Sequence, residues 1–285
     1  MLNEFKVYIP ETIEEACLLK RDGAIVLAGG TDVIIGMHGG KQRPDALVDI
    51  KGLKELQGFS FDNNGGDIGA LTLHHDIENS TYVEKVYTAL QTGCASVGAH
   101  QTRQRGTIGG NICNAAPSAD SAGPLLVFDT QCVITGLSGE RTVPLCDFYT
   151  GAKKTVLQED EILTRLLIRH PAPHSGSAYI KYGRRNAMDL ALMGVSVYLE
   201  LDDGNIRDVR IALTTMAPTP KRAYITEELI KGRYLNDNLI AEAGKSASAE
   251  SKPRTSWRAS SELRYALVEE ITQRAIRAAA KLAIG

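Results

Sequence analysis

The chain has 285 residues, of which 43% are hydrophobic and 23% charged, a composition typical of a globular protein with about two domains. Its 32 basic and 34 acidic side chains leave a net charge of −2, so we expect no nucleic-acid partner and no anionic membrane surface as a partner. No apolar run approaches the roughly 18 residues needed to span a bilayer, and residues 1–12 lack the basic start and apolar core of a signal peptide. We therefore expect a cytoplasmic protein.

The first hundred residues alternate between helical and extended patterns. Thr12 is followed by Glu15 three positions later, a capping box that predicts the start of a helix. The apolar run 24–30 ends in two glycines, which is typical of a buried strand that enters a tight loop. The other elements predicted here are a short helix at 31–40, strands at 46–50 and 68–73, and one amphipathic helix at 82–98.

The remainder of the chain changes pattern at a stretch rich in Pro, Gly and Ser, residues 170–177, which predicts a domain boundary. We place the domains at 1–173 and 177–285. A hairpin over 130–148 and a strand at 161–170 precede the boundary. Beyond it, the sequence predicts an antiparallel meander and then helices. These elements are strands at 178–185, 190–201 and 206–216, and helices at 223–232, 235–250 and 261–285.

The cysteines and histidines give no sign of a metal site. The five cysteines are widely spaced, and no two of them form a C-x-x-C pair, so we expect ordinary thiols. They are Cys17, Cys94, Cys113, Cys132 and Cys146. His74 and His75 are neighbours for which the sequence indicates no further ligand, and we expect them in a polar loop.

Two glycine-rich stretches could hold an anionic ligand. The first glycine loop is residues 27–34 (LAGGTDVI) and the second is residues 106–111 (GTIGGN). Each places two glycines beside a Thr, and we expect each at the end of a strand. Bare backbone N–H groups can line an anion-binding concavity, and a helix N-terminus after the first loop would favour negative charge. Neither loop matches the Rossmann or P-loop motif. The alternative is that both are tight turns.

Asp120 follows the second glycine loop within ten residues. It is a candidate acceptor of hydrogen bonds from sugar-like hydroxyls. The alternative is an Asx turn or a helix cap after Pro117.

Together, these motifs resemble the FAD-binding subunits of molybdenum hydroxylases, and most closely those of bacterial xanthine dehydrogenases. The resemblance rests on AGGTD (28–32), TIGGN (107–111) with APSAD (116–120), EDEIL (159–163), 177–194 and RTSWRASSELR (254–264). It implies an α+β fold, in which a two-subdomain FAD-binding domain of the vanillyl-alcohol-oxidase (PCMH) type occupies 1–173. A C-terminal domain of the CO dehydrogenase flavoprotein type, with an antiparallel sheet and helices, would occupy 177–285.

The resemblance also implies which residues bind FAD. The first glycine loop would wrap the pyrophosphate, and the second would form the opposite wall. The residues assigned in this way are Leu27, Ala28, Gly29, Gly30, Thr31, Asp32, Val33, Thr107, Ile108, Gly109, Gly110 and Asn111.

Four further positions are assigned through the same resemblance. Asp120 would hold the ribityl or ribose hydroxyls, and Leu163 would pack near the adenine. Lys181 would place its ammonium near the flavin end, where a positive charge stabilises an anionic reduced flavin. Leu190 would lie over one face of the isoalloxazine ring, or else pack in the core of a strand.

The sequence differs from those of some relatives at two positions near the flavin and in one insertion. Val97 and Ala152 stand where some relatives have aromatic residues near the flavin, so contacts to NAD cannot be transferred. The chain also lacks the cysteine-rich insertion of the variant that carries an additional iron–sulfur cluster, so we expect no cluster in this chain.

The function implied is that of an electron-transfer flavoprotein subunit, which makes the chain part of an oxidoreductase. Substrate would be oxidised at a molybdenum cofactor on a large partner subunit, and electrons would arrive through [2Fe–2S] clusters on a small partner subunit. The FAD-binding chain would pass them to NAD+ or another acceptor. It would contribute no catalytic residue and no metal ligand of its own, and it would work in a heteromer.

Three alternatives remain open at this point. The chain could be the FAD subunit of a related hydroxylase for nicotinate, carbon monoxide, an aldehyde or an aromatic acyl-CoA. It could be a self-sufficient flavin oxidase, although no candidate base is evident and neither loop has a His or Cys for a covalent flavin link. It could be a non-catalytic nucleotide-binding or scaffold protein, against which the intact glycine loops argue.

Overall fold

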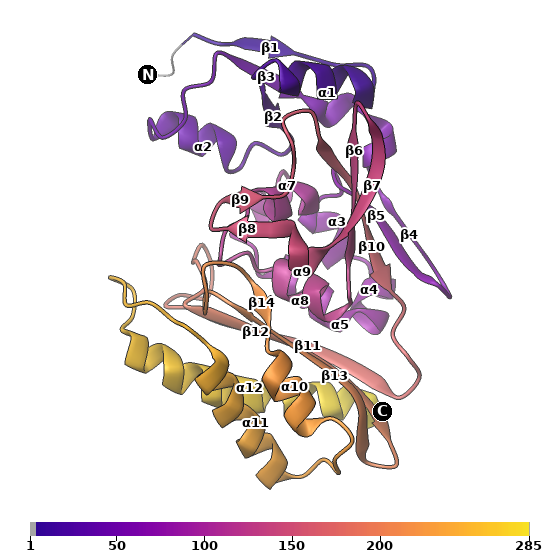
Figure 1. Ribbon diagram of the computed structural model, residues 1–285, viewed down its shortest axis with the longest axis vertical. Coiled ribbons are helices and arrows are strands. Elements are labelled where there is room, and N and C mark those ends of the chain that lie inside the picture. Colours follow the sequence, from indigo (N-terminus) through magenta and orange to yellow (C-terminus); the bar gives the residue numbers. More distant parts are fainter. Residues whose placement is uncertain (1–3, 285) are drawn as a thin grey trace.

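The computed structural model describes residues 4–284, which form three parts stacked along the long axis of the molecule (Figure 1). Residues 1–3 of the predicted N-terminal stretch, and Gly285 at the end of the last predicted helix, lie outside the described residues. Within residues 4–284, no helix combines the length and apolar character that crossing a membrane requires.

The N-terminal part contains a small parallel sheet with the strand order β1-β3-β2. The predicted capping box is confirmed, because the Thr12 hydroxyl accepts a hydrogen bond of 3.1 Å from the N–H of Glu15 at the start of α1. The elements are β1 (Lys6–Tyr8), α1 (Ile13–Arg21), β2 (Ile25–Leu27), α2 (Val33–His38) and β3 (Ala46–Asp49), followed by 3-10 turns η1 (Ile50–Gly52) and η2 (Lys54–Leu56).

The middle part is built on a five-stranded antiparallel sheet with the order β4-β5-β10-β6-β7. Strands β6 and β7 form the hairpin that the sequence predicts, although its second arm ends in a short helix, α9 (Leu145–Phe148). The strands are β4 (Phe59–Asp62), β5 (Gly65–Gly69), β6 (Gln131–Gly136), β7 (Gly139–Pro144) and β10 (Ile162–Arg169), and a separate pair is β8 (Tyr149–Gly151) with β9 (Lys154–Thr155).

Short helices connect these strands. They are α3 (His74–Glu78), α4 (Thr81–Val86), α5 (Thr88–Ala95), α6 (His100–Arg103), α7 (Ile108–Cys113) and α8 (Ala122–Val127). The prediction of one helix over 82–98 is wrong, because Tyr87 leaves the helical conformation between α4 and α5 (φ −123°, ψ 48°). Its buried ring packs edge-on against Phe128 at the position of the break, with the ring centroids 5.0 Å apart.

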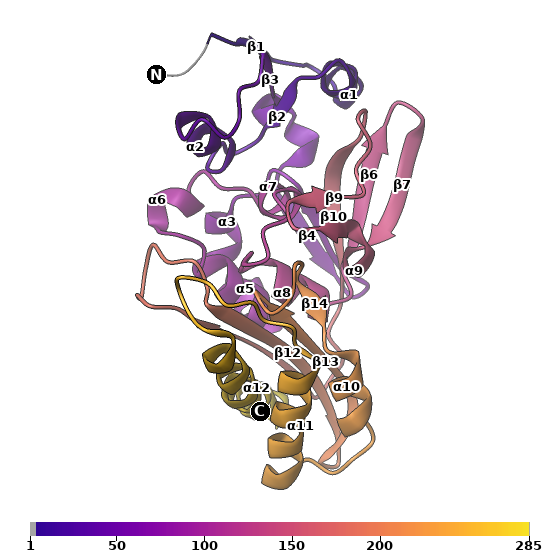
Figure 2. The same ribbon diagram turned by 60° about the vertical axis from the view of Figure 1, so that its left-hand side comes forward.

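The C-terminal part is the predicted antiparallel meander, with the strand order β11-β12-β13-β14. Helices α11 and α12 lie on one face of this sheet, and α5 and α8 of the middle part lie on the other (Figure 2). The elements are β11 (Ser175–Tyr182), β12 (Met193–Asp202), β13 (Asn205–Thr214), β14 (Lys221–Arg222), α10 (Tyr224–Ile230), α11 (Asp237–Glu250) and α12 (Ser261–Ile284).

The strand that the sequence predicts from Leu190 begins only at Met193. Residues 183–192 form a loop instead, because the Asp189 carboxylate accepts hydrogen bonds from the backbone N–H groups of Arg184 and Arg185. Met188 adopts a left-handed conformation (φ 53°) in the same loop. This loop borders the site that is described next.

Candidate functional site

The first glycine loop connects the end of β2 to α2. The backbone N–H groups of five consecutive residues in it, Gly29 to Val33, find no hydrogen-bond acceptor within residues 4–284. A row of free N–H groups that leads into a helix start is a favourable environment for an anion such as phosphate. The sequence prediction of a backbone cradle therefore has a structural counterpart in this loop.

Gly29 brings the first glycine loop against the segment before α7. A Cβ atom at Gly29 would overlap the carbonyl group of Arg105, and no side chain can relieve that overlap. Only glycine therefore allows the two backbones to approach this closely. This contact places residues 29 and 105, which are far apart in the sequence, side by side.

The second glycine loop is not at the end of a strand, as the sequence suggested, but at the start of helix α7. Thr107 is its N-cap, and its hydroxyl accepts a hydrogen bond of 3.1 Å from the N–H of Gly110. The N–H groups of Ile108 and Gly109 donate to the carbonyls of Thr72 and Ala70, both at 2.9 Å. Unlike the first loop, this loop uses the N–H groups of residues 108–111 in hydrogen bonds inside the protein.

Gly110 nevertheless faces the first glycine loop. A Cβ atom there would lie 2.7 Å from the Thr107 hydroxyl oxygen and 3.8 Å from the Cβ of Ala28. At Gly110 the second loop therefore offers a backbone without a side chain, which lets the first loop come close, rather than free hydrogen-bond donors. The structure brings together the two loops that the sequence singled out, with different chemical roles for each.

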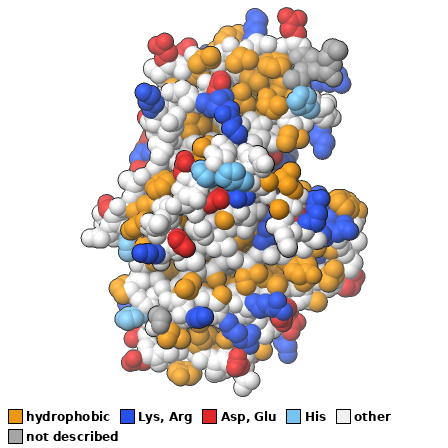
Figure 3. Space-filling view, turned by 180° about the vertical axis from the view of Figure 1, so that it is seen from behind, with side chains coloured by type: hydrophobic (Ala, Val, Ile, Leu, Met, Phe, Trp, Pro, Cys, Tyr) orange, Lys and Arg blue, Asp and Glu red, His pale blue; other side chains and the backbone are white. Residues whose placement is uncertain are grey.

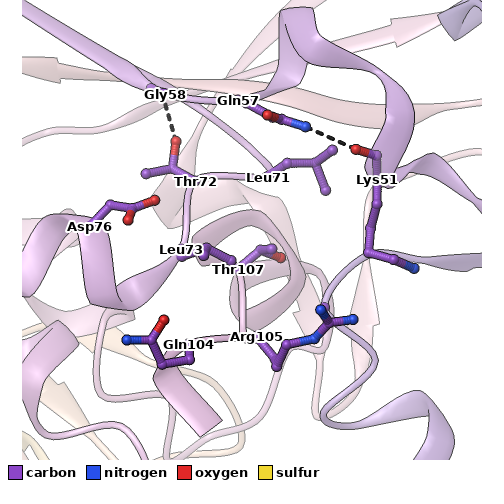
Figure 4. A pocket seen from close by; sticks show the side chains of 11 residues that line it. Lys51, Gln57, Gly58, Leu71, Thr72, Leu73, Asp76, Gln104, Arg105 and Thr107 are labelled. Carbon is purple, nitrogen blue, oxygen red and sulfur yellow. Dashed lines mark hydrogen bonds between the residues drawn. The ribbon is translucent and has the colours of Figure 1, made fainter. Parts of the chain in front are cut away.

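A pocket of about 220 Å³ lies where the two loops meet (Figure 4). Gly29 and Thr107 line it together with Lys51 and Arg105, two basic residues that the sequence analysis missed. Lys51 is paired with Asp49 at 2.6 Å, whereas the Arg105 guanidinium forms no ion pair among residues 4–284. The position of Arg105 directly before the second loop could have identified it, but nothing in the sequence marks Lys51.

Asp120 is 7% exposed and joins the middle part to β11. One carboxylate oxygen accepts a hydrogen bond of 2.6 Å from the Tyr179 hydroxyl, and the other accepts one of 2.8 Å from Lys181. Burial raises the pKa of the Asp120 carboxyl, and the positive charge of Lys181 opposes that rise. The helix-cap alternative is wrong, because Ser121 and not Asp120 is the N-cap residue of α8, and no side chain forms a capping hydrogen bond there.

Lys181 completes this arrangement by donating a second hydrogen bond of 2.8 Å to the backbone carbonyl of Ser96. Asn111 lies nearby, and its side-chain oxygen accepts a hydrogen bond of 2.8 Å from the Ser121 hydroxyl. The second glycine loop, Asp120 and Lys181 are therefore connected through neighbouring residues of the chain. These polar residues form one continuous region.

The two predicted leucines lie in different surroundings. Leu163 in β10 is 3% exposed and belongs to the core, whereas Leu190 is 51% exposed in the loop before β12. The alternative that Leu190 packs in the core of a strand is therefore wrong. Its exposure leaves an apolar side chain available for contact with another molecule.

The expectation that His75 has no potential ligands nearby is also wrong. Helix α3 contains both His74 and His75, and ligand atoms of His75, Glu78 and His100 lie within 4.8 Å of one another. However, Arg103 donates hydrogen bonds to both carboxylate oxygens of Glu78. The guanidinium therefore neutralises the negative charge that would otherwise attract a metal cation.

The chain matches two known families. Residues 3–171 match the FAD binding domain in molybdopterin dehydrogenase, and residues 178–279 match the CO dehydrogenase flavoprotein C-terminal domain. The chain is 37% identical to a putative xanthine dehydrogenase FAD-binding subunit from Escherichia coli K12, over 96% of this chain and 95% of the relative. It is 32% identical to the nicotinate dehydrogenase FAD-subunit of Eubacterium barkeri, over 72% of each chain.

The fold is also similar to solved structures. A chain of the carbon monoxide dehydrogenase from Hydrogenophaga pseudoflava superimposes with a TM-score of 0.95 at 29% identity and covers 99% of both chains. That structure lacks the Mo-pyranopterin moiety of its molybdenum cofactor. A chain of quinoline 2-oxidoreductase from Pseudomonas putida 86 superimposes with a TM-score of 0.93 at 27% identity and covers 100% of both chains.

Proposed function

Because the chain belongs to the family of FAD-binding domains of molybdopterin dehydrogenases, we propose that it takes electrons from [2Fe–2S] clusters of a partner subunit and passes them to NAD+ or another acceptor. Membership of this family makes the chain a flavoprotein oxidoreductase subunit with FAD as its cofactor. When bound, FAD supplies the chemistry of taking up electrons singly and releasing them as a pair.

The observation that carries the proposal is the row of free N–H groups in the first glycine loop. The FAD pyrophosphate is an anion, and these five N–H groups can donate hydrogen bonds to it because none of them donates to an acceptor within residues 4–284. The bare face of Gly110 lies opposite Ala28, so the two loops come close together at this point. We propose that the residues of 27–33 and 107–111 named above hold the pyrophosphate in this way.

The polar residues beside α7 would hold the remainder of the cofactor. Asp120 is fixed by Tyr179 and Lys181, and each of its oxygens retains a lone pair for a ribityl or ribose hydroxyl. The ammonium of Lys181 would provide positive charge near the flavin end, and Leu190 would cover one face of the ring. Leu163 would contribute packing near the adenine from within the core.

We propose a heteromeric and cytoplasmic complex. A large subunit would carry the molybdenum cofactor, and a small subunit would carry the [2Fe–2S] clusters. Residues 1–173 would serve as the FAD-binding domain, and residues 177–285 would serve as the C-terminal domain. No nucleic acid or membrane takes part in this function.

The substrate of the complex is proposed to be of the xanthine type. The relative named for xanthine dehydrogenase shares 37% identity, whereas those named for nicotinate, glyceraldehyde and carbon monoxide dehydrogenases share 32%, 30% and 30%. Similar FAD subunits are therefore named for dehydrogenases of different substrates. We propose that the substrate is selected outside this chain.

The visible absorption spectrum of the purified chain, before and after anaerobic addition of NADH, tests the proposal. We expect a flavin band that bleaches, which establishes both the cofactor and hydride exchange with a nicotinamide. A flavin band that persists with the partner subunits present contradicts NAD+ as the acceptor. A colourless protein that does not take up added FAD contradicts the FAD-binding function itself.

A further inference from the structure

Trp257, the single tryptophan of the chain, lies on the surface with 79% of its side chain exposed. It belongs to the segment 251–260 before α12, which runs beside the loop 183–192 (Figures 1 and 2). The guanidinium of Arg258 lies 4.8 Å from the centre of the indole ring, and that of Arg184 lies 5.7 Å from it. Two cations from different segments therefore meet at one aromatic ring.

Arg264 supports this surface from the interior. It is 2% exposed and donates hydrogen bonds to the carbonyl of Leu192 and to the Ser256 hydroxyl, so it ties the two segments together. Its Nε atom is buried and has no hydrogen-bond partner within residues 4–284. Burial lowers the pKa of Arg264, and the nearby charges of Arg254 and Arg258 lower it further.

The carboxylate in the same loop, that of Asp189, accepts hydrogen bonds from the backbone N–H groups of Arg184 and Arg185 and pairs with the Arg185 guanidinium at 3.8 Å. Within the described part of the chain, Arg184, Arg254, Arg258 and Arg264 form no ion pair. By contrast, Arg222 pairs with Asp129 at 2.8 Å and with Glu227 at 2.6 Å. The effect of Arg254 and Arg258 on the pKa of Arg264 shows that these three guanidiniums repel one another, and an anionic ligand would relieve that repulsion.

We propose that Arg184, Arg254, Arg258 and Trp257, which we call the arginine–tryptophan surface, bind the phosphate groups of a dinucleotide electron acceptor. This inference rests on the proposed function. A planar guanidinium can bind phosphate through two parallel hydrogen bonds, and the exposed indole offers apolar contact to a nucleoside.

The position of the surface suits this role. Leu190, which the proposed function places against the flavin, is in the same loop as Arg184 and is two residues from the carbonyl that Arg264 binds. In Figure 3, basic side chains lie beside hydrophobic ones at the right-hand edge, the side on which these segments lie. A dinucleotide anchored here by its pyrophosphate would lie beside the proposed flavin face.

The single tryptophan makes the test direct. FAD-saturated full-length chain is titrated with ADP-ribose, which carries the pyrophosphate and adenosine but no redox-active ring. Tryptophan fluorescence and equilibrium dialysis are followed together. We expect saturable binding that weakens with added salt and changes the fluorescence of Trp257. Arg184→Gln and Arg258→Gln should each weaken ADP-ribose binding about tenfold, as expected for the loss of a charge-assisted contact.

Arg274→Gln is the matched control, because Arg274 lies on α12 and pairs with Glu270 away from this surface. It should leave the affinity unchanged. Arg258→Lys keeps the charge and should restore part of the affinity, which separates ligand contact from misfolding.

The proposal is overturned if ADP-ribose does not bind the FAD-saturated chain, or if the Arg→Gln variants bind it as tightly as the wild type. It is also overturned if Trp257 responds only to an added partner subunit, a result that assigns the surface to a protein interface. The flavin absorption of the same samples reports on the proposed function separately, because FAD can be retained whether or not ADP-ribose binds.

Discussion

Lys181 in β11 donates a hydrogen bond of 2.8 Å to Asp120, which lies 61 residues earlier in the chain. The side chains are 16% and 8% exposed, so the ion pair is largely removed from water. Its two members come from the two regions that match different families. The pair therefore connects the proposed FAD-binding residues of the middle part to the C-terminal sheet.

Replacing Lys181 with Met should destabilise the protein by about 3 kcal/mol, because the substitution leaves the buried Asp120 charge without its partner. Urea unfolding measures the effect. The double variant Asp120→Asn/Lys181→Met removes both charges and should recover much of the loss. Equal destabilisation in the single and double variants would contradict the pairing.

The stability of the Lys181→Met variant should also depend more strongly on pH than that of the wild type. Burial raises the pKa of Asp120, and loss of Lys181 leaves that rise unopposed. A carboxyl with a raised pKa in the folded state binds protons more tightly there than in the unfolded chain. The variant should therefore lose stability relative to the wild type as pH rises from the usual Asp range towards neutrality. Unfolding free energies across this range provide the check.

Replacing Gly110 with Val should abolish retention of FAD, because the added side chain fills the space between the two glycine loops. The flavin-to-protein absorbance ratio after gel filtration measures retention. Ser80→Ala is the control, because it removes the N-cap of α4, where the Ser80 hydroxyl accepts a hydrogen bond from the N–H of Val83, and Ser80 is not among the proposed FAD-binding residues. This control should cost about 1 kcal/mol of stability through the lost cap. If Gly110→Val retains full flavin, the proposed wall is not at Gly110.

We expect the burial of His74 to make the folded protein less stable in mild acid. Burial lowers its pKa to about 4, and its Nδ1 has no hydrogen-bond partner within residues 4–284. The unfolded chain binds a proton at His74 more tightly than the folded chain does. The stability that neutral His74 contributes is therefore complete above the usual His range and is lost as pH falls towards 4. The slope should approach about 1.4 kcal/mol per pH unit. In His74→Gln, the same urea series should lack this component.

Asp129 should stabilise the contact between the middle and C-terminal parts. It pairs with Arg210 at 3.1 Å and with Arg222 at 2.8 Å, and Arg210 is 4% exposed. Asp129 also has a positive φ of 50°, which Asn tolerates. Asp129→Asn therefore removes the charge without backbone strain and should lower the free energy of unfolding by about 2 kcal/mol. An unchanged denaturation midpoint would show that these ion pairs contribute nothing.

The sequence predicted the features that depend on local chemistry. The capping box at Thr12, the hairpin over 130–148 and the C-terminal meander need only neighbouring residues and are confirmed. The recognisable motifs around Gly29 and Gly110 also identified two loops that lie close together in the structure.

The features that sequence reasoning missed depend on distant partners. Tyr87 interrupts a helical pattern where its ring packs against Phe128, which lies far along the chain. Lys51 reaches the pocket only through the fold, and the partners of Asp120 come from β11. The predicted strand at Leu190 failed because hydrogen bonds to Asp189 stabilise a loop instead.

One apolar core contains residues from both family-matched regions. Tyr179 and Tyr198 of the C-terminal sheet pack in the same cluster as Leu125 and Phe128 beside the middle sheet. The junction between the two matches, near residues 171–178, therefore joins regions that share an apolar contact, although the C-terminal region also has a core of its own. Dividing the chain there would expose Tyr179, Tyr198 and the apolar side chains they cover to water, so we expect each separated region to be less stable than it is in the intact chain.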